Sequence, residues 1–190
     1  MEIHSEFSVG AAPATVYEAL LDLERVGPCI PGAEIGAADA DGGYPAEIAV
    51  RVGPMRLTYR GTVRVDERDD PARRATLVAD VRETRGQGTA HSRMSMTVSG
   101  RESGSHVDAN TVVELTGRAA QMGSGIVESV AARLVADMAT NLERLLASEE
   151  PAAVTEAPGV AAAAPEPARP IGGLRLLLRA LWDRVRHRGP

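Results

Sequence analysis

The order of apolar and polar residues over positions 1–147 predicts a strand, a helix, six further strands and a long final helix. Apolar and polar residues alternate from Glu2 to Val9, as in a strand with one buried face. Pro13 marks the start of a helix, because proline suits the first helical position. The apolar residues that face inward from this helix are Val16, Tyr17, Leu20 and Leu21.

Six strand-like runs follow, separated by short turn-forming segments. The runs cover residues 33–36, 44–52, 55–68, 75–83, 89–99 and 107–116. The separators DADGG, VGP, RDDPAR, TRGQG and SGRESGS are rich in residues that favour tight turns. Consecutive strands joined in this way predict a meander of antiparallel hairpins.

The final helix of this region is predicted over residues 125–146, about 33 Å at 1.5 Å per residue. One stripe of this helix is apolar and consists of Ile126, Val130, Leu134, Met138, Leu142 and Leu145. A long helix that packs against a curved antiparallel sheet gives an α+β fold. Residues 1–147 have a suitable length for one domain.

The composition of residues 148–170 predicts a linker between this domain and the last twenty residues. The segment holds five prolines among Ala and Glu, and proline removes helix donors and fixes φ. We therefore expect a disordered, extended tether that reaches roughly 70 Å when fully stretched.

Residues 171–190 predict a basic amphipathic helix that lies on a membrane surface. Charges recur too often for a membrane span, but one face is apolar and arginines occupy the flanks. The predicted membrane-binding residues are Leu174, Arg175, Leu177, Leu178, Arg179, Leu181, Trp182, Val185 and Arg186. The same spacing also suits a helix that docks in a groove of a partner protein, and the sequence leaves both uses open.

Charge is divided unevenly between the two parts of the chain. From Arg169 onward there are six Arg and one Asp, a net charge of +5. Residues 1–168 carry 15 Arg and 25 acidic residues, a net charge of −10. An acidic body is repelled by anionic lipid, so the tail is the expected contact. Nucleic-acid binding by the body is also disfavoured, because an acidic body repels the phosphates of DNA and RNA.

The single cysteine, Cys29, excludes an internal disulfide and a cysteine cluster for metal, and it fits a reducing compartment. The N-terminal residues have neither a basic start nor a long apolar run, so no secretion signal is expected. We therefore expect a peripheral protein at the cytoplasmic face of the inner membrane.

Four segments carry a resemblance to a known family. They are VGPMRLTYRGTVRVDERDDPARRATL, CIPGAE at positions 29–34, RGQGTA at positions 85–90, and LTGRAAQMGSGIVESVAARLVADMATNLERLL at positions 115–146. Together they resemble the CoxG family, named for the G subunit of carbon monoxide dehydrogenase, in the START/polyketide-cyclase-like (SRPBCC) superfamily. The resemblance implies a helix-grip (START/Bet v 1-like) fold, in which a curved seven-stranded antiparallel sheet surrounds a long C-terminal helix and leaves an apolar cavity.

This resemblance also implies a function. Members of the family resemble accessory proteins that recruit a molybdenum hydroxylase of the carbon monoxide dehydrogenase type to the inner membrane. Electrons from that enzyme enter the quinone pool there, so a hydrophobic pocket tethered to the membrane suits a bound quinone, menaquinone or ubiquinone. No intrinsic cofactor is expected.

Apolar residues on the predicted strands and final helix are candidates to line the cavity. Methionine side chains among them adapt to a guest that is not rigid. The candidates are Tyr44, Met55, Leu57, Tyr59, Met94, Met96, Met122, Ile126 and Val130. Each of them is equally suited to filling an ordinary core.

Catalytic machinery is not recognisable, and we expect a protein that is not an enzyme. The four histidines, His4, His91, His106 and His187, lack metal-ligand spacing. The acids at positions 66–70 are typical of a solvated turn. Gly123 and Gly125 suggest close helix–sheet packing more than a phosphate site, because no P-loop lysine follows. The alternative is a cyclase- or hydrolase-like enzyme of the same superfamily that acts on a small apolar substrate.

Overall fold

A computed structural model describes residues 1–53 and 55–149. The helices are α1 (Pro13–Leu21), α2 (Leu23–Val26) and α3 (Ser124–Glu149), with 3₁₀ turns at Gly27–Cys29 and Ala119–Met122. The strands are β1 (Glu2–Val9), β2 (Ala33–Ile35), β3 (Tyr44–Val52), β4 (Met55–Asp69), β5 (Arg74–Glu83), β6 (Thr89–Arg101) and β7 (Gly104–Leu115).

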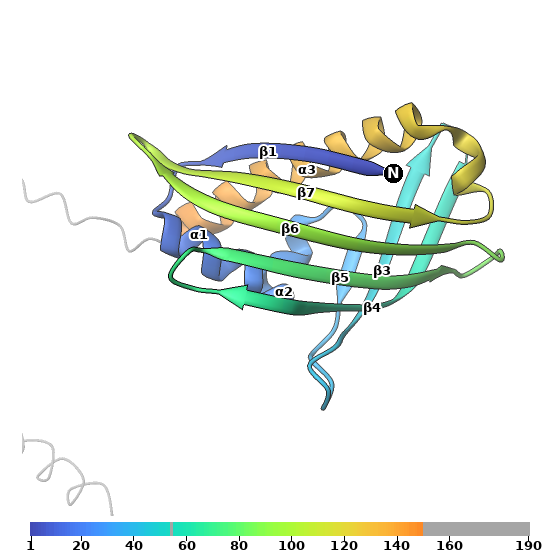
Figure 1. Ribbon diagram of the computed structural model, residues 1–190, viewed down its shortest axis with the longest axis horizontal. Helices are drawn as coiled ribbons and strands as arrows, with labels where there is room; N and C mark the ends of the chain where they lie inside the picture. Colours follow the sequence, from blue (N-terminus) through green and yellow to red (C-terminus); the bar gives the residue numbers. More distant parts are fainter. Residues whose placement is uncertain (54, 150–190) are drawn as a thin grey trace, which may run out of the picture. The chain divides into compact units, whose positions relative to one another are not determined.

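All seven strands belong to one antiparallel sheet with the order β1-β7-β6-β5-β4-β3-β2. Strands β2 to β7 follow one another as a meander, and β1 pairs with β7, the last strand. Figure 1 shows the long strands β5, β6 and β7 on one side and helix α3 crossing behind them. The curved sheet therefore has a concave face that holds α3, and the predicted α+β architecture is confirmed.

Strand β4 permits a close approach of two backbones at Gly61. A Cβ atom added at Gly61 would lie 2.0 Å from the carbonyl oxygen of Asp80 on β5, so only glycine fits there. A β-bulge between Val65 and Glu67 interrupts the β4–β5 register a few residues later. Bulges increase local twist, and both features help the sheet to curve around the helix.

The concave face of the sheet holds the apolar core, in two separate clusters. The larger cluster joins α1 and α2 to the C-terminal end of α3, with Val16, Val98, Val107 and Leu142 almost fully buried. The smaller cluster, at the other end of the sheet, is centred on Leu57, Tyr59 and Ala119.

Helix α3 is buried at its C-terminal end only. Leu142 and Leu146 are buried, whereas Val130, Leu134 and Met138 of the apolar stripe are half-buried and Ile126 is 47% exposed. The stripe predicted from the sequence is thus present, but its first half does not reach a closely packed core. Space remains between this half of the helix and the sheet.

The predicted strands and the two predicted helices are all present, with ends that differ by three residues or fewer. The final helix extends through Ser148 and Glu149, so it takes up the first two residues of the predicted linker. Arg25 of α2 pairs with Glu149, which holds this last turn against the domain. Among the described helices, none has the length and apolar character needed to cross a membrane. The rest of the linker and the amphipathic tail helix lie outside the described residues.

Candidate ligand-binding cavity

The central cavity lies between α3 and strands β1, β4, β5, β6 and β7, and has a volume of about 260 Å³. Small-molecule sites typically have roughly 300–1,000 Å³, so this cavity is near the lower limit. Hydroxyl groups of Ser5, Ser92 and Thr111 are the polar side-chain groups of its wall. The apolar side chains of the wall include Phe7, Leu20, Ile35, Leu77, Met94, Met96, Val107, Val135 and Met138.

A second, smaller cavity of about 110 Å³ lies beside the N-terminal half of α3. Tyr59 is the one residue of its wall with a polar side chain. The other residues of the wall are Val50, Val52, Leu57, Leu115, Ala119, Met122, Ile126, Val127 and Val130.

Tyr59 has a buried hydroxyl group without a hydrogen-bond partner among the described residues. Glu83 lies opposite Tyr59 in the β4–β5 register, is 4% exposed and pairs with the guanidinium group of Arg118. Burial, and then the charge of Glu83, raises the pKa of the Tyr59 phenol. Tyr59 therefore keeps its proton at neutral pH and remains a donor that none of residues 1–53 and 55–149 accepts from.

An open groove of about 610 Å³ runs along the outer side of the small cavity. One wall is the end of β3, Ala49–Val52, and the other is the first half of α3. Val50, Val52, Ile126 and Val130 line both the groove and the small cavity, so the two spaces are neighbours. Three arginines, Arg51, Arg56 and Arg133, also belong to the groove.

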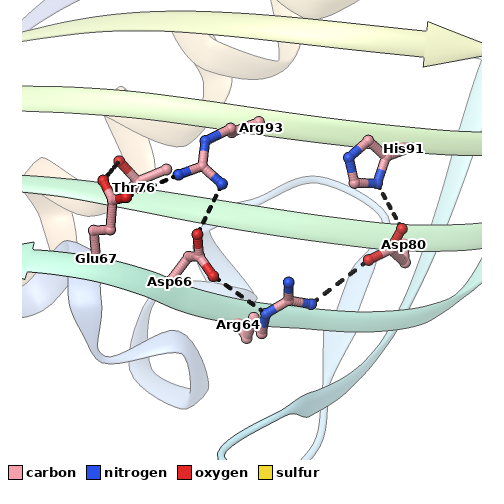
Figure 2. Close-up of polar contacts among 7 residues, drawn as sticks. All are labelled: Arg64, Asp66, Glu67, Thr76, Asp80, His91 and Arg93. Atoms are coloured by element: carbon pink, nitrogen blue, oxygen red, sulfur yellow. Dashed lines mark hydrogen bonds and ion pairs between the residues drawn. The ribbon is translucent and has the colours of Figure 1, made fainter.

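The opposite, outer face of the sheet carries a network of ion pairs (Figure 2). Arg93 on β6 contacts Asp66 at 2.7 Å and Glu67 at 3.1 Å. Arg64 lies 3.6 Å from both Asp66 and Asp80, and Nδ1 of His91 lies 2.6 Å from Asp80. Oppositely charged cross-strand neighbours stabilise a sheet, so this network has a structural explanation.

Comparison with known proteins identifies the family. The family model for CoxG, the G subunit of carbon monoxide dehydrogenase, matches residues 5–147. The chain belongs to this family. The resemblance inferred from the sequence motifs is thereby confirmed. No curated protein matches the sequence.

Solved structures with the same fold share little sequence with this CoxG family member. A conserved protein from Geobacillus kaustophilus is 15% identical with a TM-score of 0.69, and the match covers 78% of this chain and 96% of that one. The Zhui aromatase/cyclase from Streptomyces sp. R1128 is 14% identical, with a TM-score of 0.52 and coverage of 81% and 98%. A START superfamily protein from Mycobacterium smegmatis is 14% identical, with a TM-score of 0.50 and coverage of 77% and 97%. These similarities show a START/Bet v 1-like fold.

The nine residues predicted to line one cavity are divided by the structure among several places. Met94 and Met96 line the central cavity, and Leu57, Tyr59, Met122, Ile126 and Val130 line the small one. Tyr44 is half-buried and packs against the larger core cluster. Met55 is 37% exposed at the start of β4, because the strand extends past the end of the core there.

Most of the central cavity wall was missed by the sequence-based prediction. Phe7, Leu20, Leu77 and Val107 come from four different elements, and only the fold brings them together. Strand alternation predicts that Phe7 and Val107 lie on the concave face. Alternation alone, however, does not distinguish a residue that lines a cavity from one that fills the core. Met138 was recognised on the helix stripe without being assigned to the cavity.

The predictions for the glycines before helix α3 and for Cys29 have different outcomes. The expectation that Gly123 and Gly125 allow close helix–sheet packing is wrong, because a Cβ atom at either position would meet nothing within 4 Å. Gly123 instead has a φ of +81°, which glycine adopts readily. Cys29 is buried, as expected for a small core side chain, and burial raises the pKa of its thiol.

Proposed function

We propose that this CoxG family protein is a non-catalytic accessory protein of a molybdenum hydroxylase of the carbon monoxide dehydrogenase type. In this proposal it recruits the enzyme to the cytoplasmic face of the inner membrane. It also binds an apolar ligand, a menaquinone or ubiquinone, and so couples the enzyme to the respiratory chain. The description of the family supports the link to carbon monoxide dehydrogenase.

The observation that carries the ligand-binding part is the space beside helix α3. The first half of the helix presents an apolar stripe that the sheet does not cover closely, and the small cavity and the groove lie along it. The central cavity lies further along the same helix, beside Val135 and Met138. Side chains that line an apolar space make fewer van der Waals contacts than side chains in a filled core. An apolar guest supplies those contacts and therefore stabilises the protein. Flexible Met94, Met96 and Met138 side chains allow the walls to adapt to that guest.

The wall chemistry supports binding of a quinone. A quinone combines an apolar ring and chain with carbonyl oxygens, which accept hydrogen bonds. The central cavity combines apolar side chains with the hydroxyl donors of Ser5, Ser92 and Thr111. Sites for small molecules commonly have this composition, a mainly apolar wall with a few polar groups that fix orientation.

Mass spectrometry of organic extracts tests the proposal. The full chain, purified from its own cells, is expected to yield a prenylquinone. Met138→Glu places a charge at the central cavity and is expected to lower the quinone content. Its matched control is Val112→Glu, since Val112 is 49% exposed on the outer face of β7. Extracts without quinone or other lipid would contradict the proposal, and an enriched product of a cyclisation or hydrolysis would favour the enzyme alternative.

A further inference from the structure

Two arginines are paired across the hairpin at the mouth of the groove. Arg51 on β3 and Arg56 on β4 are directly paired in the register of the hairpin, and both are exposed. Neither forms an ion pair with another residue within 1–53 or 55–149. Like charges directly opposite each other destabilise a hairpin. An anion bound between them would remove that cost.

Helix α3 adds a third arginine to the same mouth. The side chain of Arg133 is 82% exposed and lies 3.6 Å from Asp137, the one acidic residue of the groove. The groove thus holds three arginines and one acid, whereas residues 1–149 as a whole hold 15 arginines and 22 acids. The local charge is opposite in sign to that of the surrounding body.

Exposed apolar side chains accompany these charges. Ile126 is 47% exposed and lines the groove, and Met55, 37% exposed, lies opposite the groove residue Val52 in the hairpin. Arginines around exposed apolar groups form the pattern that binds an interface of anionic headgroups and acyl chains.

We propose that this groove mouth docks on an anionic bilayer and is the portal through which the apolar ligand leaves the lipid phase. Arg51, Arg56 and Arg133 meet lipid phosphates, while Met55 and Ile126 enter the boundary of the acyl chains. The portal part rests on the proposed function, whereas the docking part does not. This contact belongs to the domain itself and is separate from the predicted tail helix.

A membrane fits this mouth better than an acidic protein surface does. The apolar walls of the groove, Val50, Val52, Ile126 and Val130, are shared with the small cavity. A bilayer placed over the mouth therefore gives an apolar ligand a path that avoids water, and avoiding water matters because exposing apolar surface is unfavourable. A protein partner seated on the mouth would instead block this path for the ligand.

Vesicle partition of the full chain tests the docking. The double variant R51Q/R56Q removes two cations, each worth about 1 kcal/mol near an anionic surface. Together they predict a partition coefficient about thirty-fold lower for vesicles of phosphatidylglycerol and phosphatidylcholine. Phosphatidylcholine vesicles should show little difference. The matched control is R82Q/R101Q, which removes two exposed arginines that lie outside the groove.

A dye that responds to its surroundings locates the contact on the body. It is attached at Ser129→Cys in the groove, with Cys29→Ser to remove the native thiol, and Ser103→Cys provides the control position. A blue shift on anionic vesicles is expected at position 129 and not at position 103. Equal partition of R51Q/R56Q and R82Q/R101Q, or equal spectra at the two positions, would overturn the docking proposal.

Further outcomes separate the docking from the proposed function. A normal quinone content with unchanged partition of R51Q/R56Q leaves the proposed function standing and overturns the docking. A thirty-fold loss of partition in a chain that never carries quinone supports the docking and removes the proposed function. Loss of hydroxylase binding by R51Q/R56Q, with partition unchanged, would assign the mouth to a protein and overturn the membrane proposal.

Discussion

The two buried tyrosines differ in what their hydroxyl groups contact. The Tyr17 hydroxyl lies 2.9 Å from the carbonyl oxygen of Arg74 and 3.1 Å from Oδ1 of Asp70. The Tyr59 hydroxyl is buried without a partner among the described residues. Unpaired buried polar groups carry a desolvation cost that paired ones recover. A ligand with an acceptor oxygen would supply the hydrogen bond that the Tyr59 hydroxyl lacks, whereas the Tyr17 hydroxyl already has its partners.

Matched Tyr→Phe variants test this difference. Tyr17→Phe is expected to lower the free energy of unfolding by about 1 kcal/mol, because it removes a hydrogen-bonded hydroxyl. Tyr59→Phe is expected to leave the ligand-free protein as stable as the parent, or more stable by about 1 kcal/mol. Urea denaturation measures both values. A loss of more than about 1 kcal/mol for Tyr59→Phe would show that its hydroxyl has a partner in solution.

Helix α3 packs closely into the core at its C-terminal end and loosely at its N-terminal end. Leu142 is fully buried in the larger core cluster, whereas Ile126, four turns earlier on the same stripe, is 47% exposed. Leu142→Ala is expected to destabilise the fold by about 2–5 kcal/mol through the cavity that it leaves. Ile126→Ala should change stability by about 0.5 kcal/mol or less.

Thermal unfolding together with bound-quinone content distinguishes the two halves. Leu142→Ala should lower the melting temperature, while the folded fraction keeps its quinone. Ile126→Ala should keep the melting temperature of the ligand-free protein and bind quinone more weakly. Equal destabilisation by both substitutions would mean that the whole helix packs into a filled core.

The elements were predictable from the sequence because strand alternation, turn residues and a helix stripe are local signals. The meander also followed, since short turns leave few other topologies. The division of the nine cavity candidates was not predictable. Met94 and Leu57 look alike as apolar strand positions, and only the fold places them beside different cavities. The Arg51–Arg56 pair likewise required the hairpin register.

At the scale of the whole molecule, the sequence predicts an acidic body joined by a linker to a basic amphipathic tail. The tail is expected to give salt-sensitive binding to anionic vesicles, because apolar burial and five net positive charges act together. Leu178→Asp with Leu181→Asp should abolish most of that binding in flotation experiments. Val154→Asp with Val160→Asp, in the linker, adds the same charge and should have little effect. Normal flotation of the tail variant would favour a helix that docks on a partner protein.

We propose that an apolar guest occupies the space between the sheet and helix α3. The six methionines provide probes for it, since Met94, Met96 and Met138 line the central cavity and Met122 lines the small one. Met1 is exposed and serves as the internal control.

The most direct measurement is NMR of methionine methyl groups during titration of the ligand-free full chain with a short-chain quinone in detergent. We predict saturable shifts at Met94, Met96 and Met138, weaker shifts at Met122, and none at Met1 beyond those caused by detergent. Shifts confined to the exposed Met1, or no shifts at any methionine, would contradict ligand binding between the sheet and helix α3.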